Sequence, residues 1–181
     1  MLGLIVLGCN SSDSEGKKLS SNLNSVKEAS NENNQNKTST SNEMVTLPNQ
    51  IEIGIESIVE KNEMVEINVY SLNSYPIAGV QFEITPKDIF EIDSINGGRC
   101  SNVDFTLKSN KEGLMLGFSM SGNLIPVSKS KDNVENILFT AYGKKIKKVR
   151  NQIITIQATI AGKGGTRLDV VSIPYSWTSN F

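Results

Sequence analysis

The sequence predicts an all-β fold, a nine-stranded sandwich of two sheets preceded by a disordered tether. From residue 51 onward, short segments alternate apolar and polar residues, as half-buried strands do. Turn residues separate them, and no stretch combines ten or more residues, helical spacing and good helix formers. A Ser- and Asn-rich segment precedes the strands and lowers the hydrophobic share of the 181 residues to 38%, against about 45–50% in ordinary globular chains.

The N-terminal residues 1–8 read MLGLIVLG, and Cys9 follows them. This pattern resembles a bacterial lipoprotein signal, with Val6-Leu7-Gly8-Cys9 in place of its lipobox. The resemblance implies cleavage before Cys9, acylation of Cys9, and an extracytoplasmic protein anchored to a bacterial membrane, at the outer membrane or cell surface. Such signals carry a basic region at their start, but the first basic residue here is Lys17, so we expect the true start to lie upstream of Met1.

Residues 9–47 are predicted to form the lipid anchor and a flexible linker. Between residues 10 and 43 there are nine serines and eight asparagines, and five acids nearly balance four bases. Such a composition cannot bury enough apolar surface to offset the entropy lost on ordering. We therefore expect a disordered tether that holds the following domain, residues 48–181, away from the membrane.

The domain is predicted from nine strand-like segments, at residues 51–59, 64–72, 77–85, 89–95, 104–109, 113–120, 136–143, 152–161 and 168–174. Turn-forming residues punctuate them at 73–76, 96–98, 121–123 and 162–165. Alternation predicts which side chains point into the core: Val65, Ile67 and Val69; Val80, Phe82 and Ile84; Leu114, Leu116, Phe118 and Met120; and Ile154, Ile156, Ala158 and Ile160. One apolar and one mostly polar face is what a sheet with one solvated side requires.

Composition excludes several classes of function. The chain has no histidine, which excludes Ser-His-Asp and Cys-His nucleophiles and His-ligated zinc or haem. A net charge of −1 offers no field that would attract nucleic acid. Cys9 and Cys100 make no disulfide framework, and we expect Cys100 to be a packed or loop thiol. Four loop acids match no calcium motif, so we expect no metal and no cofactor: Asp88, Asp93, Asp104 and Asp132.

Several of these strand segments together resemble cohesin modules. Residues 51–54 and 64–69 resemble the opening strands of that family, and residues 77–84 (IAGVQFEI) resemble its hallmark strand. Residues 90–92, the Gly97-Gly98 turn, 114–122 (LMLGFSMSG) and 134–141 (VENILFTA) follow in the expected order. The resemblance implies a jelly-roll sandwich, shared with cellulose-binding-type carbohydrate modules, and a non-catalytic protein that binds a dockerin-like partner.

The resemblance also suggests where a partner binds, because strand 77–85 lies in the partner-facing sheet of cohesins. Gln81 and Glu83 should point outward from it, and Met115 and Ser119 should extend the surface on strand 113–120. Several cohesins have an acidic residue where this chain has Gln81, a departure that bears on dockerin recognition.

Other interpretations remain open from the sequence. In a carbohydrate-binding module, Tyr175 and Trp177 would stack on sugar rings, although burial of these aromatics is the simpler expectation. A structural envelope protein and a glycosidase with paired carboxylates are further alternatives. The densest charge cluster, with five bases, is expected to be a solvated hairpin that protects a sheet edge: Lys144, Lys145, Lys147, Lys148 and Arg150.

Overall fold

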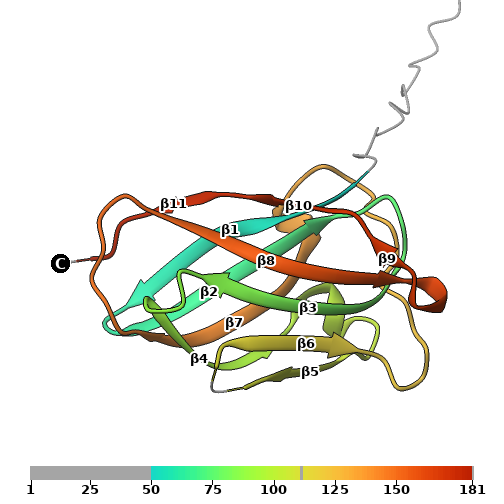
Figure 1. Ribbon diagram of the computed structural model, residues 1–181, viewed down its shortest axis with the longest axis horizontal. Helices are drawn as coiled ribbons and strands as arrows, with labels where there is room; N and C mark the ends of the chain where they lie inside the picture. Colours follow the sequence, from blue (N-terminus) through green and yellow to red (C-terminus); the bar gives the residue numbers. More distant parts are fainter. Residues whose placement is uncertain (1–49, 111, 181) are drawn as a thin grey trace, which may run out of the picture. The chain divides into compact units, whose positions relative to one another are not determined.

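The computed structural model describes residues 50–110 and 112–180, so Cys9 and the predicted tether lie outside the described residues. The described part is a sandwich of two β-sheets, which confirms the predicted fold class (Figure 1). Its three helices are short, namely α1 (Gly98–Ser101), η1 (Val134–Asn136) and η2 (Lys163–Gly165). None of the helices in this part of the chain has the length and apolar character needed to cross a membrane.

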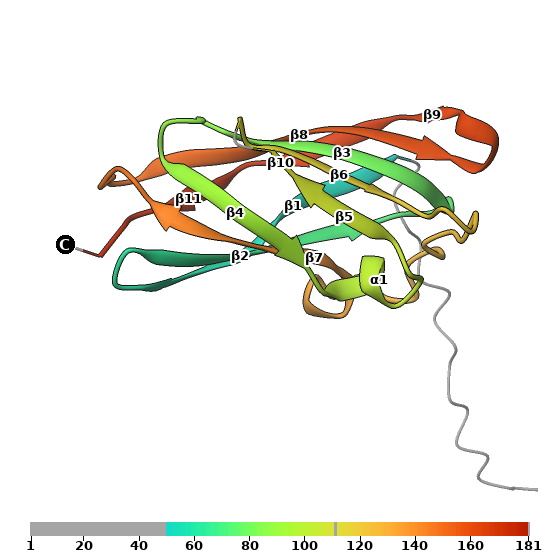
Figure 2. The same ribbon diagram turned by 90° about the horizontal axis from the view of Figure 1, so that it is seen from below.

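The first sheet has five strands in the order β10-β1-β2-β7-β4. The second has the order β11-β8-β3-β6-β5, with β9 paired to β8 as its sixth strand. Figure 2 shows β8, β3 and β6 in one layer and β2 and β7 in the other. The bounds are β1 Ile51–Lys61, β2 Met64–Leu72, β3 Ile77–Thr85, β4 Phe90–Asn96, β5 Thr106–Ser109, β6 Leu114–Phe118, β7 Ile137–Lys145, β8 Gln152–Gly162, β9 Arg167–Leu168, β10 Val170–Ile173 and β11 Tyr175–Trp177.

The last predicted strand, 168–174, is wrong as a single element. Its residues divide between β9, which pairs with β8, and β10, which pairs in parallel with β1 of the other sheet. Pro174 follows β10, and the chain then returns to β8 as β11. Proline has no backbone N–H to give to a ladder, so the chain leaves the first sheet at this point.

The core lies between the sheets and contains the side chains expected from β2, β3 and β8. Two aromatic pairs join the layers. The ring centroids of Phe82 on β3 and Phe139 on β7 are 5.1 Å apart, and those of Phe90 on β4 and Trp177 on β11 are 5.0 Å apart. Both pairs are tilted, and aromatic pairs at such distances stabilise a fold beyond the effect of the surface area that they bury.

The predicted orientation of β6 is wrong. Met115 is completely buried, whereas Leu116 and Phe118 are 38% and 40% exposed and Met120, just after the strand, is more exposed still. Pairing with β3 explains the reversal, because Met115 lies opposite Phe82 and Gly117 opposite Val80. Directly paired residues point to the same face of a sheet, and β3 already directs its Phe and Val inward.

Candidate functional site

The outer face of the six-stranded sheet is the candidate functional site, and β3 runs through its middle. Val80, Phe82 and Ile84 are buried, so the residues between them point outward. Gln81 is exposed, as predicted. Glu83 is half-buried and its carboxylate lies 3.1 Å from the Lys87 ammonium. The predicted orientation of both residues is therefore confirmed.

The two residues predicted on β6 do not extend this face as expected. Met115 is buried and cannot contact a partner there. Ser119 is half-buried, and its hydroxyl oxygen accepts hydrogen bonds from the backbone N–H groups of Ser121 (3.2 Å) and Asn123 (3.1 Å). Ser119 thus stabilises the turn that follows β6.

Leu116 and Phe118 occupy the outer side of β6 in their place. Leu116 lies opposite Gln81 on β3, and Phe118 lies opposite Gly79. Alternation alone placed both residues in the core, because every second residue from Leu114 to Met120 is large and apolar. The residues between them include Met115 and a glycine, so they looked like the outward-facing set. The signal that could have found them is the pairing with β3, whose phase the sequence did indicate.

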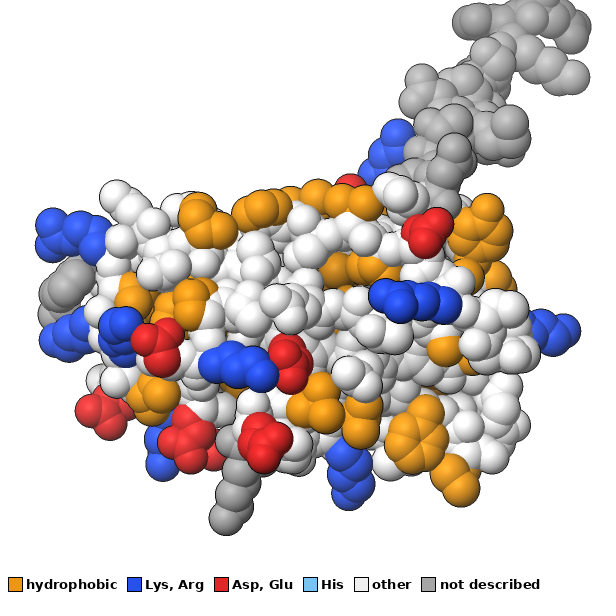
Figure 3. Space-filling model, viewed as in Figure 1, with side chains coloured by type: hydrophobic (Ala, Val, Ile, Leu, Met, Phe, Trp, Pro, Cys, Tyr) orange, Lys and Arg blue, Asp and Glu red, His pale blue; other side chains and the backbone are white. Residues whose placement is uncertain are grey.

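The register continues across the sheet and defines two rows on its outer face. One row runs Thr159, Gln81, Leu116, Lys108, and the other runs Ala161, Gly79, Phe118, Thr106. Each row contains short or uncharged side chains on β8 and β3 and an exposed apolar side chain on β6. A shallow depression of about 240 Å³ lies along β3 and β8, lined by Gln81, Phe82, Glu83, Gln157, Ala158 and Thr159. The same face is seen in Figure 3, where white and orange atoms surround a few separate charged side chains.

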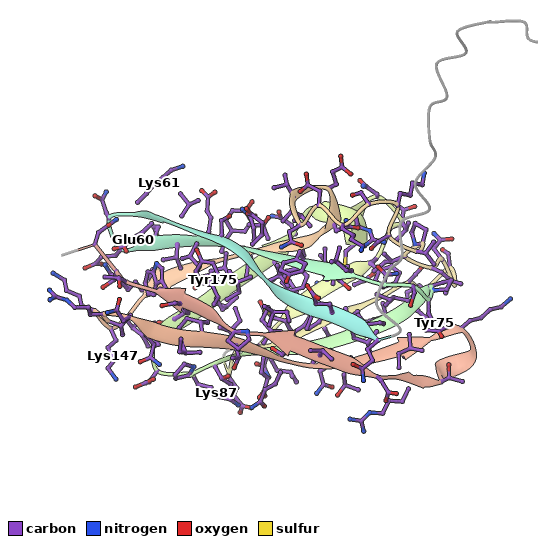
Figure 4. All side chains as sticks on the ribbon, turned by 90° about the horizontal axis from the view of Figure 1, so that it is seen from above. Glu60, Lys61, Tyr75, Lys87, Lys147 and Tyr175 are labelled. Carbon is purple, nitrogen blue, oxygen red and sulfur yellow. The ribbon has the colours of Figure 1, made fainter. Side chains whose placement is uncertain are left out.

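The alternative sugar-binding residues do not form a platform. Trp177 is only 7% exposed because it packs on Phe90, and Tyr175 is partly buried against the core. Figure 4 shows Tyr175 between the ends of the sandwich. A surface that stacks on sugar needs exposed rings, so the carbohydrate-binding alternative is not favoured.

A separate cavity of about 250 Å³ opens where β4 and the β5–β6 turn approach each other. Its lining includes two acids, Glu91 and Glu112, but the wall between them is formed by Ile84, Phe90 and Ile92 of the core. Lys87 is the remaining polar side chain of the lining, and it pairs with Glu83. We assign no catalytic step to this cavity.

The basic cluster is not simply a solvated hairpin, so that prediction is wrong for Lys145. Its side chain is buried and forms an ion pair with Glu60 at the far end of β1. Burial alone would raise the pKa of Glu60, but the hydrogen bonds and charge of Lys145 and the backbone N–H of Asn180 outweigh it, so the pKa lies below its usual value. Lys147 is exposed and pairs with Asp88 at 2.8 Å. Figure 4 shows Glu60 and Lys147 at one end of the sandwich and Tyr75 at the other.

Arg99, on the short helix α1, is the centre of a polar cluster that the sequence did not reveal. Its Nη1 donates to Ser71 O (3.0 Å), Asn73 Oδ1 (2.8 Å), Ser128 Oγ (3.1 Å) and Asn136 Oδ1 (3.2 Å), and its Nη2 donates to Pro126 O. Burial lowers the pKa of Arg99 below its usual value. The guanidinium joins the end of β2, the loop after β6 and the short helix η1 through neutral oxygens.

Cys100 follows Arg99 and is completely buried, as the prediction of a packed thiol requires. Burial raises the pKa of the thiol to about 12, although the nearby Arg99 charge opposes the change. Two of the four acids make structural contacts, since Asp88 pairs with Lys147 and Asp132 accepts from the N–H of Val134, whereas Asp93 lies in strand β4. The described residues contain no group of three or more Cys, Asp or Glu side chains placed to hold a metal.

The sequence matches no protein-family model and no curated protein. Among solved structures, one similar chain is a non-cellulosomal cohesin from the hyperthermophilic archaeon Archaeoglobus fulgidus, with a TM-score of 0.49 and 14% identity, covering 72% of this chain and 92% of that one. The domain is similar to cohesin modules. A second cohesin-like match, a chain of a cohesin–dockerin complex, has a TM-score of 0.49 and 11% identity over 71% of this chain and 100% of that one. An exo-β-N-acetylglucosaminidase from Vibrio harveyi matches over only 18% of its length, with a TM-score of 0.32 and 11% identity.

Proposed function

We propose that this chain is a non-catalytic protein-binding module that binds a dockerin-like partner through the outer face of β8, β3, β6 and β5. The observation that carries the proposal is the exposed pair Leu116 and Phe118 on β6, beside the uncharged outer residues of β3 and β8. The resemblance of residues 77–84 to the hallmark strand of cohesins supports the same face.

The physical argument rests on what these side chains would gain from a partner. Burying apolar surface is worth about 25 cal/mol per Å², and both side chains are only partly covered in the domain itself. Interface cores lack charge and contain aromatic anchors. Phe118 has only two side-chain torsions, so fixing it in an interface costs little conformational entropy.

The proposal includes a membrane anchor at Cys9. Support comes from the Val6-Leu7-Gly8-Cys9 sequence alone. Acyl chains on Cys9 would hold the module on the outside of a bacterial membrane, since each buried CH₂ adds about 0.8 kcal/mol. The Ser- and Asn-rich segment would then give the binding face its reach.

The test measures affinity for dockerin modules encoded in the same genome, with the full chain immobilised in a biosensor. Leu116→Asp places a charge on the proposed face, and Val171→Asp is a matched control, because Val171 is 39% exposed on β10 of the other sheet. We expect Leu116→Asp to weaken binding at least about tenfold, or ~1.4 kcal/mol, and Val171→Asp to leave it unchanged. Failure of every dockerin module to bind, or equal effects of the two variants, would contradict the proposal.

A further inference from the structure

The guanidinium of Arg99 carries a positive charge that no acid of residues 50–110 or 112–180 neutralises, because no carboxylate among them lies within ion-pair distance of it. The oxygens that accept its hydrogen bonds are all uncharged: Ser71 O, Asn73 Oδ1, Pro126 O, Ser128 Oγ and Asn136 Oδ1. Arg99 is nevertheless half-buried, and a charge taken out of water is costly unless it is paired. The described part of the domain therefore holds this cation without a counter-charge.

Arg99 also lines an open cavity of about 320 Å³. The cavity lies between α1, the loop after β6 and the short helix η1, and its lining comes from residues 99–102, 126–130 and 135–136. Figure 2 shows α1 beside β7, the strand that η1 precedes. One water molecule takes up about 30 Å³ in the liquid. The volume is therefore larger than a single carboxylate or phosphate group needs, and it leaves room for the rest of a small organic molecule.

Two further donors line the same cavity. Lys129 is exposed and forms no ion pair with any residue that the structure describes. Ser130 is half-buried, and its Oγ accepts from the N–H of Asp132 (3.3 Å) and from Asn136 Nδ2 (3.4 Å). Its hydroxyl group therefore still has a proton to donate. Two cations and a hydroxyl donor around one cavity are suited to hold an oxyanion, because charged donors form the stronger hydrogen bonds to such groups.

One acid, Glu135, belongs to the lining as well. It is exposed, and it is not within ion-pair distance of Arg99 or Lys129. Its charge repels an anion placed against it and attracts a hydrogen-bond donor. The ligand that fits best thus presents its oxyanion to Arg99 and Lys129 and a hydroxyl or ammonium group to Glu135.

We propose that this cavity binds the oxyanion group, a carboxylate or a phosphate, of a small organic ligand, with Arg99, Lys129 and Ser130 as its donors. The planar guanidinium of arginine matches the geometry of both groups. The bound group supplies the counter-charge that Arg99 lacks in the described chain. The lining residues lie outside β3, β5, β6 and β8, so the site is separate from the face proposed to bind a protein.

The experiment titrates the full chain with inorganic phosphate and, separately, with acetate, at an ionic strength held constant with sodium chloride. NMR follows the backbone amide signals of residues 99–102 and 126–136. We expect saturable shifts in these segments, with a dissociation constant in the millimolar range, for at least one of the two anions. Saturation by phosphate alone assigns a phosphorylated ligand, and saturation by acetate alone assigns a carboxylate. Shifts that rise linearly with both anions would overturn the proposal.

Two variants at exposed residues test the charges of the lining, while Arg99 stays in place because its loss is expected to destabilise the domain. Lys129→Gln should weaken the binding about threefold, as the loss of an exposed charge pair does, and Glu135→Gln should strengthen it. Both variants should keep the native melting temperature. Lys131→Gln and Glu91→Gln are the matched controls, because they remove the same charges from exposed residues outside the lining. Equal effects of Lys129→Gln and Lys131→Gln would overturn the proposal, because net charge alone would then explain the binding.

Discussion

The side chains of Glu60 and Lys145 form an ion pair that is nearly closed to solvent, with 4% and 7% of their surfaces exposed. The pair also holds the end of the described chain, since the N–H of Asn180 donates to Glu60 Oε2 (2.9 Å) and Lys145 Nζ donates to Asn180 O (3.2 Å). Residues from β1, from β7 and from the segment after β11 thus meet at one end of the sandwich. Removal of one partner would leave the other charge buried.

Lys145→Met should therefore lower the free energy of unfolding by about 3 kcal/mol, as broken buried pairs do. The double variant Glu60→Gln with Lys145→Met is the control, because it removes both charges and keeps a group that accepts from Asn180. Urea denaturation of the three proteins measures the difference. If the double variant is as unstable as Lys145→Met, an unpaired Glu60 charge is not the cause.

The same pair predicts a dependence on pH. The folded pKa of Glu60 lies below its ordinary value, so its contribution is present above the unfolded pKa of about 4.3 and is lost as the pH falls through the folded pKa. The gap in stability between the native chain and Glu60→Gln should be widest near neutral pH and should close on acidification below pH ~4. A gap that stays constant from neutral to acidic pH would contradict this assignment.

Phe82 and Phe118 form a matched pair on neighbouring strands, one inside and one outside. Phe82→Ala should cost about 3–5 kcal/mol, because it leaves a cavity beside Phe139. Phe118→Ala removes a side chain that is 40% exposed and should cost less than about 1 kcal/mol. Thermal unfolding of both variants measures the contrast. Equal losses of stability would mean that the orientation of β6 is not the one described.

The β6 result shows what the sequence can and cannot predict. Strands β2, β3 and β8 alternate one apolar set with one polar set, so their inward faces and the sandwich could be predicted from local pattern. In β6 both phases are apolar, and only pairing with a strand distant in sequence decides between Met115 and Leu116. Two of the proposed contact residues, Leu116 and Phe118, therefore required the three-dimensional structure.

The buried polar contacts were unpredictable for a related reason. Lys145 lies among four other basic residues, and nothing local distinguishes it from them. Its partner Glu60 precedes it by 85 residues, and Arg99 meets oxygens that are 26 to 37 residues away. The pattern of charges along the chain predicts that these residues lie at the surface. Contacts between residues so far apart in the sequence follow only from the fold.

Cys100 should be unreactive in the folded protein. The Cys9→Ala variant leaves Cys100 as the single thiol of the chain, so a thiol reagent at pH 8 reports on it alone. Its pKa of about 12 and its complete burial keep the reactive thiolate scarce and covered. We expect negligible labelling under native conditions and complete labelling in denaturant. Rapid labelling of the native protein would contradict the described packing of α1.

Cys9→Ala also tests the membrane anchor. With a complete upstream signal, the native protein should partition into the detergent phase, and the variant should move to the soluble fraction. Cys100→Ala is the control for a general effect of losing a thiol. Partitioning that is the same for all three proteins would contradict lipidation at Cys9.

Arg99→Met should be among the most destabilising changes in the domain. It removes the donor shared by Ser71 O, Asn73 Oδ1, Ser128 Oγ and Asn136 Oδ1, and Ser71, Asn73, Ser128 and Asn136 are all buried. Hydrogen bonds to charged groups contribute about 1.5–3 kcal/mol each, and unpaired buried acceptors add a desolvation cost, so we expect a loss of at least about 3 kcal/mol in urea denaturation. Arg99→Lys supplies a compact cation to the oxygens around Nη1 but cannot also reach Pro126 O, because it lacks the planar fork, and it should recover part of the loss. If Arg99→Lys is no more stable than Arg99→Met, the charge at Nη1 is not what holds these loops together.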